Sequence, residues 1–169
     1  MEIVPETPRP LTTAELSAYL SFTEVSALLR PAVEKQLKDV GALSYVQFQL
    51  LARLGDAPSG SRSMTDLADG VAYSRSGLTY QAQLLDQRGL VSRAASPEDE
   101  RRVVVSITDA GRDVLAAVFP GHIALVRELL FASLSEADTE SLARILGQVG
   151  TRLREAPPRS AAPRRRRSA

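Results

Sequence analysis

Residues 63–111 read SMTDLADGVAYSRSGLTYQAQLLDQRGLVSRAASPEDERRVVVSITDAG. A short helical segment begins at Ser63 or Thr65, and a longer one begins at Ser74 and ends near Gly89. Two β-branched runs follow, Leu90–Arg93 and Arg102–Ile107, and the residues between them form a turn that carries arginine. Two helices followed by a hairpin with a basic tip predict a winged helix-turn-helix. Such a unit can place a helix in the DNA major groove and an arginine in the adjacent minor groove.

The composition is that of a soluble globular protein. Hydrophobic residues make up 44% of the 169 residues and charged residues 24%. No run approaches the uncharged apolar length of a membrane span, and the N-terminus lacks the pattern of a secretory signal. We therefore expect a cytoplasmic protein without membrane contact.

Few residues are available for metal binding or catalysis. Cysteine is absent, which excludes disulfides and zinc-thiolate sites, and His122 is the only histidine. There is no nucleophile-histidine pair, no glycine-rich phosphate loop and no metal-ligand spacing. We expect neither a cofactor nor an enzyme, and we interpret His122 as a surface or interface residue.

The charge is unevenly distributed. Residues 154–169 hold six arginines against one glutamate, a local charge of +5 that leaves −4 for the rest of a chain with net charge +1. We expect this tail to be disordered, and its arginines either stay solvated or contact phosphates without sequence preference. An acidic body that binds DNA must do so through a localised basic surface.

The flanking segments are predicted to be helical. Residues 1–11 form a proline-rich arm, and Thr12 with Glu15 has capping-box spacing for a helix that runs to Gly41. Pro31 should kink that helix or split it into two, and we expect a kink. Ser44 caps a second helix, and residues 56–60 form a loop.

The C-terminal part is also predicted to be helical. Thr108 caps a helix that runs toward Phe131 and should be disturbed at Pro120 and Gly121. Ser135 with Asp138 has capping-box spacing for the last helix. That helix carries an apolar stripe: Leu142, Ile145, Leu146, Val149 and Leu153.

The helix after Ser74 has two distinct faces. At 100° per residue, Leu78, Ala82 and Leu85 point toward a core. The other side carries hydrogen-bonding groups that can contact base edges in the major groove. The residues we assign to that groove are Ser74, Arg75, Ser76, Thr79, Tyr80 and Gln83. The alternative is a surface helix with an ordinary polar face.

The turn between the two predicted strands forms the candidate wing. We expect Arg101 to enter the minor groove, and Asp99 to fix the shape of the tip by accepting hydrogen bonds. Ser63 and Thr65, at the start of the preceding helix, are candidates for phosphate contacts. The alternative for the wing is a solvated charged turn, because Glu98 and Glu100 weaken its attraction to phosphate.

These residues resemble the MarR family of winged-helix transcriptional regulators. The wing-to-helix signature is Asp99-x-Arg101, Ile107-Thr108 and Gly111, and the segment Leu67 to Val91 resembles the family's helix-turn-helix. The resemblance extends over roughly residues 12–153. Pro31 departs from it, because the first helix is usually continuous in such proteins.

The resemblance implies a homodimer that reads a near-palindromic operator in double-stranded DNA, most simply as a repressor. It implies a mainly α-helical fold with a small β-hairpin wing (α+β), in which residues 43–108 form the winged domain. Residues 12–42 and 109–153 form a helical dimerisation region. The apolar stripe of the last helix suits that role, although it could equally pack inside one subunit.

The resemblance also implies a small aromatic or phenolic effector that releases the DNA. Tyr19, Phe22, Tyr45 and Phe48 are candidates to line its site, although aromatic residues on apolar helix faces are more often core. A different class of function stays open, in which a winged-helix dimer binds a protein partner and never reads DNA.

Overall fold

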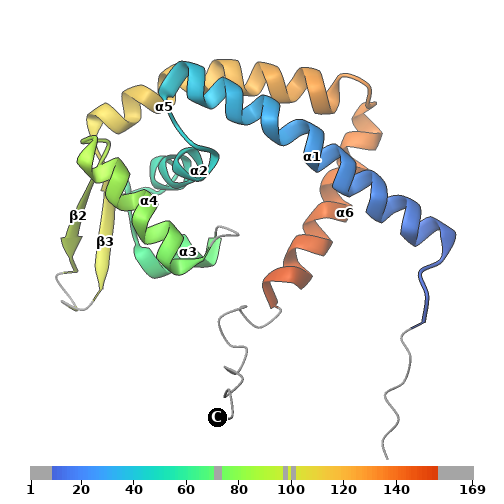
Figure 1. Cartoon of the computed structure of the whole chain (residues 1–169), viewed down its shortest axis with the longest axis horizontal. Coiled ribbons are helices and arrows are strands. Elements are labelled where there is room, and N and C mark those ends of the chain that lie inside the picture. Colours follow the sequence, from blue (N-terminus) through green and yellow to red (C-terminus); the bar gives the residue numbers. More distant parts are fainter. Residues whose placement is uncertain (1–8, 71–73, 97–98, 100–101, 156–169) are drawn as a thin grey trace, which may run out of the picture. The chain divides into compact units, whose positions relative to one another are not determined.

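The structure is a computed structural model that describes residues 9–70, 74–96, 99 and 102–155. It is mainly α-helical with a three-stranded antiparallel sheet, which confirms the predicted fold class (Figure 1). The chain divides into two compact units at Val126 and Arg127. Most of the N-terminal arm and the whole tail beyond residue 155 lie outside the described residues.

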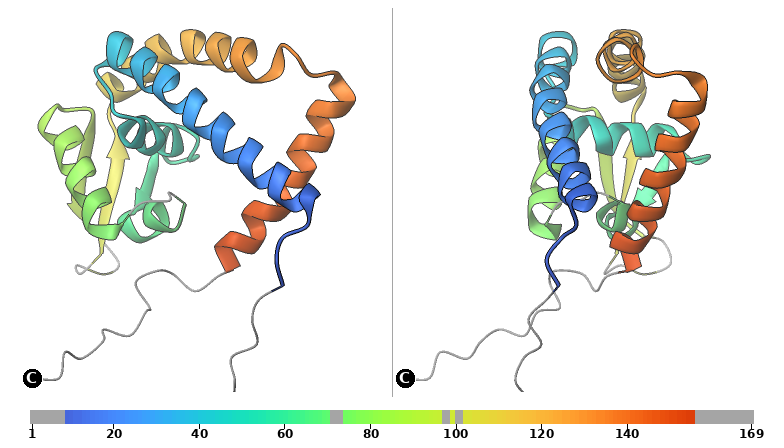
Figure 2. Two further views of the ribbon diagram at one scale, coloured as in Figure 1. Left: turned by 45° about the vertical axis from the view of Figure 1, so that its right-hand side comes forward. Right: turned by 90° about the vertical axis from the view of Figure 1, so that its right-hand side faces the viewer.

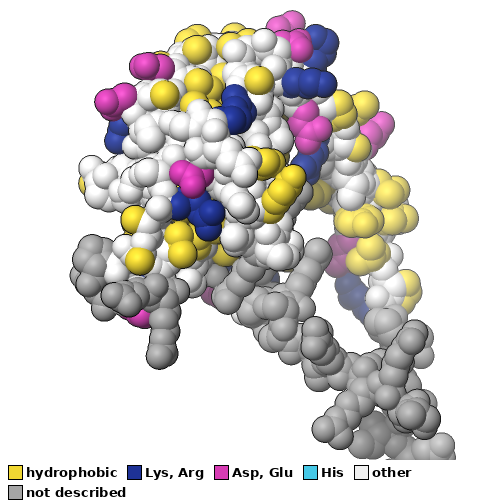
Figure 3. Space-filling view, turned by 60° about the vertical axis from the view of Figure 1, so that its left-hand side comes forward, with side chains coloured by type: hydrophobic (Ala, Val, Ile, Leu, Met, Phe, Trp, Pro, Cys, Tyr) yellow, Lys and Arg dark blue, Asp and Glu magenta, His cyan; other side chains and the backbone are white. Residues whose placement is uncertain are grey.

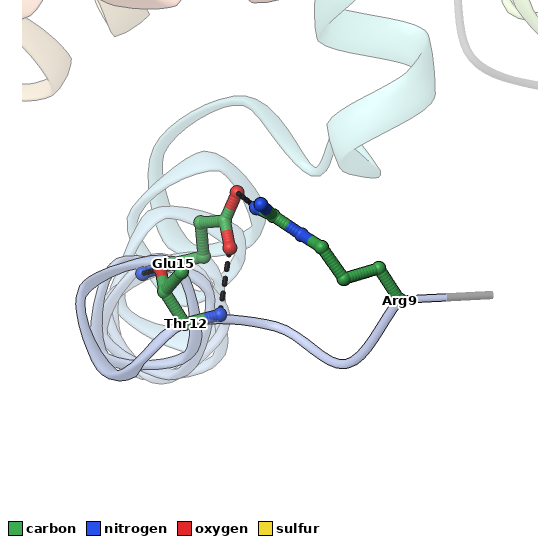
Figure 4. A network of polar contacts seen from close by, with 3 residues as sticks. All are labelled: Arg9, Thr12 and Glu15. Atoms are coloured by element: carbon green, nitrogen blue, oxygen red, sulfur yellow. Dashed lines mark hydrogen bonds and ion pairs between the residues drawn. The ribbon is translucent and has the colours of Figure 1, made fainter.

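Helix α1, Thr13–Gly41, begins with the predicted capping box. The Glu15 backbone N–H donates to Thr12 Oγ1 at 3.2 Å, and the Thr12 N–H donates to Glu15 Oε2 at 2.7 Å (Figure 4). Arg9 adds an ion pair to the other Glu15 oxygen at 3.6 Å. Hydrogen bonds from the Thr12 backbone and side chain to the carboxylate lower the pKa of Glu15. The helix start is therefore determined by local sequence.

Helix α1 runs through Pro31 as one element, so the helix is not split there. A proline inside a helix removes one N–H donor and crowds one preceding carbonyl, while the turns on either side keep their hydrogen bonds. Val33 and Leu37 follow directly and are buried in the core. Packing of the C-terminal half outweighs the local cost of the proline.

The winged unit follows the predicted order, with one strand added. Helix α2 spans Tyr45–Gly55 and is capped by Ser44, and α3 spans Met64–Gly70. Helix α4 spans Arg75–Gln87, where the Gly77 N–H donates to Ser74 Oγ at 3.2 Å. Strand β1, Ser61–Ser63, was not predicted and continues the chain from the loop at residues 56–60.

The sheet has the order β1–β3–β2, with all pairs antiparallel. Strands β2, Val91–Ala95, and β3, Val103–Ile107, form the predicted hairpin, in which Val91 pairs with Ile107. Strand β1 joins the other edge of β3, where Ser61 pairs with Ser106. The hairpin is therefore anchored to the chain that leads into α3.

Helix α5, Asp109–Val126, also differs from the prediction. Thr108 caps it as expected, through a 3.1 Å bond from the Gly111 N–H to Thr108 Oγ1. The helix continues through Pro120 and Gly121, so the predicted disturbance there is wrong. The interruption comes later, as one π-helical turn at Arg127–Phe131. The C-terminal half of α1 packs on α5, and Gln36 Nε2 donates to the Val118 carbonyl at 3.2 Å (Figure 2).

One helical stretch, Asp109–Phe131, is long and apolar enough to cross a membrane by length and composition alone. This differs from the expectation that no run approaches a membrane span, which rested on uncharged length: the uncharged run Val114–Val126 ends at Arg127 and Glu128. Leu115 and Val118 of this helix are buried in the core of the first unit, where they pack with α1 and α2. Part of the apolar surface of this helix therefore belongs to the hydrophobic core of the first unit.

The second unit contains helix α6, Glu136–Glu155, which begins with the expected cap. The Asp138 N–H donates to Ser135 Oγ at 3.2 Å, and Ser135 Oγ donates to Asp138 Oδ2 at 2.6 Å. No residue of α6 is buried. The predicted apolar stripe exists, and four of its members are exposed: Ile145, Leu146, Val149 and Leu153.

The hydrophobic core lies in the first unit and draws on every helix and on both hairpin strands there. Val33 and Leu37 of α1 pack in the same cluster as Leu51 of α2 and Leu85 of α4. Val118 of α5 belongs to it as well. The winged unit therefore shares its core with the ends of α1 and α5.

Candidate nucleic-acid interface

The inner face of α4 fixes the helix to the rest of the winged unit. Leu78, Ala82 and Leu85 are fully buried, as the periodicity predicted. Burying each leucine is worth about 1.5–3 kcal/mol relative to exposure, so these side chains hold the inner face of α4 against the core. The residues on the opposite face are therefore held at defined positions.

The outer face of α4 is exposed and polar. Ser76, Thr79, Tyr80 and Gln83 are all exposed, and Tyr80 has 58% of its surface accessible. Ser74 is exposed as well, but its hydroxyl accepts the capping hydrogen bond. Arg75 lies in the first turn, and its side chain lies outside the described residues. The face can present donors, acceptors and one aromatic ring to a DNA groove.

The start of α3 presents a second set of polar groups. Ser63 Oγ accepts from the Asp66 N–H at 3.1 Å and donates to Asp66 Oδ2 at 2.7 Å. This hydroxyl therefore serves as the helix cap, and a phosphate contact by it would replace the bond to Asp66. Thr65 is exposed and lines a small notch of about 110 Å³ with Met64, Ala68 and Thr79. The notch joins α3 to the outer face of α4.

The wing has a closed base. The Ser96 N–H donates to the Arg102 carbonyl at 2.7 Å, and the Arg102 N–H donates to the Asp99 carbonyl at 2.9 Å. The Asp99 carbonyl thus takes part in closing the turn, and Asp99 is exposed. The predicted role of its side chain in shaping the tip stays a prediction. Arg101, the predicted minor-groove residue, lies outside the described residues. Its assignment stays a prediction from sequence.

Sequence reasoning missed an arginine in this region. Arg93 lies on the same face of β2 as the buried Val91, is half-buried, and pairs with Val105 across the hairpin. Its Nε is buried and has no hydrogen-bond partner among the described residues. No sequence pattern distinguishes it, because the strand alternation is too short to assign its face.

The four aromatic residues assigned to an effector site are not gathered in one place. Phe48 is buried in the core, whereas Tyr19 and Phe22 are 58% and 57% exposed on the N-terminal half of α1. Tyr45 is half-buried, with the Arg30 guanidinium 5.1 Å from its ring centroid. It lines an open groove of about 410 Å³ together with Glu34, Lys38, Ala42, Leu43 and Ser44.

His122 is half-buried on α5 beside the ring of Phe48. Its ring centroid lies 4.7 Å from that of Phe48, which in turn contacts Phe119 edge-to-face at 5.7 Å. Burial lowers the pKa of His122 below its ordinary value. Within the described part of the chain, no group of three or more acidic, histidine or cysteine side chains could hold a metal ion.

The described surface carries both signs of charge. Figure 3 shows one face, where lysine and arginine side chains are interspersed with aspartate and glutamate. Among the described side chains of this face neither sign forms a large field, so contacts of this face with DNA would depend on individual groups.

Comparison with known proteins agrees with this geometry. A sequence model described as "MarR family" matches residues 43–102, which include α2, α3 and α4. MhqR of Bacillus subtilis (strain 168), an HTH-type transcriptional regulator, is 30% identical over 142 residues, which cover 83% of this chain and 94% of MhqR. YetL of the same organism, an HTH-type transcriptional repressor, is 26% identical over 148 residues, covering 88% and 87%.

A solved structure matches as well. Sco3205, a MarR family transcriptional regulator from Streptomyces coelicolor crystallised in complex with DNA, aligns with a TM-score of 0.83 and 31% identity. The alignment covers 90% of this chain and 94% of Sco3205. It therefore extends over the flanking helices as well as the winged unit.

Proposed function

This chain belongs to the MarR family of DNA-binding transcriptional regulators, and we propose that it is a homodimeric repressor of a near-palindromic operator. The observation that carries the proposal is the two-faced helix α4, with Leu78, Ala82 and Leu85 buried beneath an exposed polar surface. The protein acts on DNA and is not an enzyme. We place it in the cytoplasm, where a chromosomal operator is accessible.

The outer face of α4 reads base edges in the major groove. Gln83 can bridge an adenine edge, and Thr79 or Tyr80 can contact a thymine methyl group. Ser74, Arg75 and Ser76 act at the start of the helix, where phosphates come close. Arg101 enters the minor groove from the wing, whose base is closed by the Ser96–Arg102 hydrogen bond. Thr65 and Ser63 contact the backbone.

Two apolar surfaces support a dimer. Along the first half of α1, Leu16, Leu20 and Leu28 are 45–70% exposed together with Tyr19 and Phe22. On α6, Ile145, Leu146 and Val149 are exposed along one stripe. Helices with such stripes normally bury them, and a second copy of the chain would cover both. Residues 12–42 and 109–153 are accordingly the dimerisation region, and residues 43–108 the DNA-binding domain.

A dimer would present two copies of α4 about 34 Å apart, one turn of DNA. The repressor role is supported by the similarity to YetL, which is a repressor. A small aromatic effector would act by favouring a different separation of the two helices. We assign this effector to the groove of about 410 Å³ beside Tyr45, which is the one of the four candidate aromatic residues that lines it.

The decisive test is selection of genomic DNA by the full-length protein. Sheared DNA of the source organism is incubated with the protein in excess competitor, and the retained fragments are sequenced. We expect retained fragments to share one near-palindromic sequence and to stay bound as salt is raised moderately. Retention of no sequence above competitor would contradict the proposal and favour a protein-interaction module.

The wing is tested on the selected fragment. Arg101→Ala should weaken binding while the fold and the oligomeric state are unchanged. Lys35→Ala is the matched control, because it removes one positive charge from the exposed surface of α1, where Lys35 pairs with Asp39. Equal affinities of Arg101→Ala and the parent at matched salt would exclude the wing role.

A further inference from the structure

Arg88 connects two helices that are far apart in the sequence. Its Nη1 donates to the Ala42 carbonyl at 2.8 Å, and its Nη2 donates to the Gly41 carbonyl at 3.0 Å. Gly41 is the last residue of α1, and Arg88 is the C-cap of α4. The guanidinium therefore joins the C-terminal ends of α1 and α4 directly.

The end of α1 suits this contact. The last carbonyls of a helix have no partner within it. Ala42 adopts a left-handed conformation, φ 50°, and its N–H donates back to the Leu37 and Lys38 carbonyls. The Gly41 and Ala42 carbonyls thus stay available at the negative end of the helix dipole. A planar guanidinium can bond both at once, which a lysine ammonium does less well.

Arg88 is also held firmly on the α4 side. Its own N–H donates to the Leu84 carbonyl at 3.2 Å, and the turn is closed by a 3.0 Å bond from the Leu90 N–H to the Leu85 carbonyl. Gly89 provides the positive φ, 69°, that this turn requires. Since Leu85 is fully buried, Arg88 is attached to a helix end that has little freedom.

Arg88 lies away from the expected base contacts. Helix α4 has 13 residues, so its two ends are about 20 Å apart. Ser74 and Arg75 are at the opposite end from Arg88, next to α3 (Figure 1). The polar residues assigned to the groove lie mostly in the first two turns. The position of Arg88 thus favours a link between helices over a direct contact with a base.

We propose that Arg88 is a positioning residue that couples the direction of α4 to α1 and thereby sets the separation of the two reading helices in the dimer. The inference rests on the proposed function, in which α1 belongs to the dimerisation region and α4 lies in the groove. Loosening the link would let each α4 tilt relative to its dimer helix. The dimer would then tolerate operators whose half-sites are wrongly spaced.

The test uses the selected operator and two derivatives in which one base pair is inserted or removed between the half-sites. Each change moves one half-site by about 3.4 Å and rotates it by about 35°. The parent should bind the selected operator much more tightly than either of the two derivatives. Arg88→Ala should bind the natural operator about 5- to 20-fold more weakly and lose most of that discrimination. Lys35→Ala, which removes an exposed charge from the C-terminal half of α1, should keep that discrimination.

Two further measurements separate the possible roles of Arg88. A phosphate contact would lower the slope of log affinity against log salt by about 2 in Arg88→Ala, about 0.9 for each of the two copies in the dimer, whereas a positioning residue leaves that slope unchanged. Arg88→Lys keeps the charge and provides a second variant if Arg88→Ala folds poorly. Arg88→Lys should also weaken the preference for the natural half-site spacing, because one ammonium replaces less well a guanidinium that donates to both the Ala42 and Gly41 carbonyls.

Unaltered spacing discrimination in a folded Arg88 variant would overturn the inference, and so would a reduced salt slope with unaltered discrimination. If the parent protein itself is monomeric or selects no operator, the proposed function fails and the inference fails with it. If the parent binds and discriminates but the Arg88 variants do so equally, the proposed function stands without this role of Arg88.

Discussion

The imidazole of His122 lies against the ring of Phe48, with ring centroids 4.7 Å apart and planes inclined by 55°. The contact joins α5 to α2 at the edge of the core. The Nδ1 atom of His122 is buried and has no hydrogen-bond partner among the described residues. Burial therefore disfavours the protonated ring and lowers the pKa of His122.

This burial predicts that the protein loses stability in mild acid. The unfolded chain takes up a proton near the ordinary histidine pKa, whereas the folded protein does so only at lower pH. Between these values the unfolded state binds more protons, so stability is complete above the ordinary pKa and falls as the pH is lowered. His122 is the only histidine, so no other side chain normally titrates in that range.

The measurement compares the parent with His122→Gln. Between about pH 7.5 and about pH 5.5, the Tm of the parent should fall by about 1–3 °C more than that of the variant. An equal fall in both proteins would show that protonation of His122 does not oppose folding.

Gly111 is predicted to tolerate no side chain. A Cβ at this position would clash with the Leu90 carbonyl oxygen and would lie 2.9 Å from Ile107 Cγ1. The same carbonyl accepts the Thr108 N–H at 3.2 Å, so the backbone there is already fixed. We expect Gly111→Ala to lower the free energy of unfolding by about 1–3 kcal/mol, measured by urea denaturation.

Gly147 is the matched control for this substitution. It lies in the middle of α6, and an added Cβ would meet no atom within 4 Å. Gly147→Ala should raise the free energy of unfolding by up to about 1 kcal/mol, because alanine favours the helix. If the two substitutions changed the free energy of unfolding equally, Gly111 of α5 would not be packed closely against the Leu90 carbonyl.

The sequence predicted those parts of the fold that depend on nearby residues. Thr12, Ser44 and Ser74 each cap a helix by bonding the third residue along, and such spacings can be read directly. The face of α4 followed from the spacing of Leu78 and Leu85. Both are fully buried.

The features that sequence reasoning missed depend on distant contacts. Strand β1 is a strand because Ser61 pairs with Ser106, and their hydroxyls are 2.7 Å apart although 45 residues separate them. Pro120 does not interrupt α5, which packs on α1 through Val118 and Gln36. Likewise no local pattern marks Arg88, whose partners are backbone carbonyls on another helix.

The candidate interface, like the fold, was predicted where it depends on nearby residues. Exposure of Thr79, Tyr80 and Gln83 follows from helical periodicity. The capping role of the Ser63 hydroxyl could be anticipated only in part, since Ser63 and Asp66 have the spacing of a cap. The wing tip around Arg101 lies outside the described residues, so its assignment still depends on the sequence alone.

Gln83 is predicted to contribute base specificity and almost no stability. Its side chain is exposed on α4, and a glutamine that bridges an adenine edge is worth about 1–3 kcal/mol of discrimination. Gln83→Ala should weaken operator binding by about that amount per half-site and relax the preference at one base pair of each half. Surface substitutions usually change folding stability by less than about 0.5 kcal/mol, so its Tm should stay close to that of the parent.

The comparison needs a set of operators with each base pair substituted in turn. Gln148→Ala, at an exposed position of α6, is the control and should bind the whole set as the parent does. If Gln83→Ala bound every operator with the parent's affinities, Gln83 would have to be removed from the reading surface.

The apolar stripe of α6 is predicted to be a dimer contact. Ile145, Leu146 and Val149 are 41–50% exposed, and among the residues of α6 none is buried within the chain. A second copy that covers them would remove this apolar surface from water, at about 25 cal/mol for each Å². Leu146→Glu places a charge in the stripe and should therefore weaken the dimer. Thr151→Glu adds the same charge on the opposite side of the helix and should not.

Sedimentation equilibrium of the three proteins gives the masses, and binding to operators with one or two half-sites gives the functional consequence. The parent and Thr151→Glu should be dimers of the 18.2 kDa chain and should prefer the complete operator. Leu146→Glu should be largely monomeric and should bind both DNAs weakly and almost equally, because the second half-site no longer adds affinity through a shared dimer. A dimeric Leu146→Glu would show that the apolar stripe of α6 is not needed for the dimer, and would leave α1 as the surface to test.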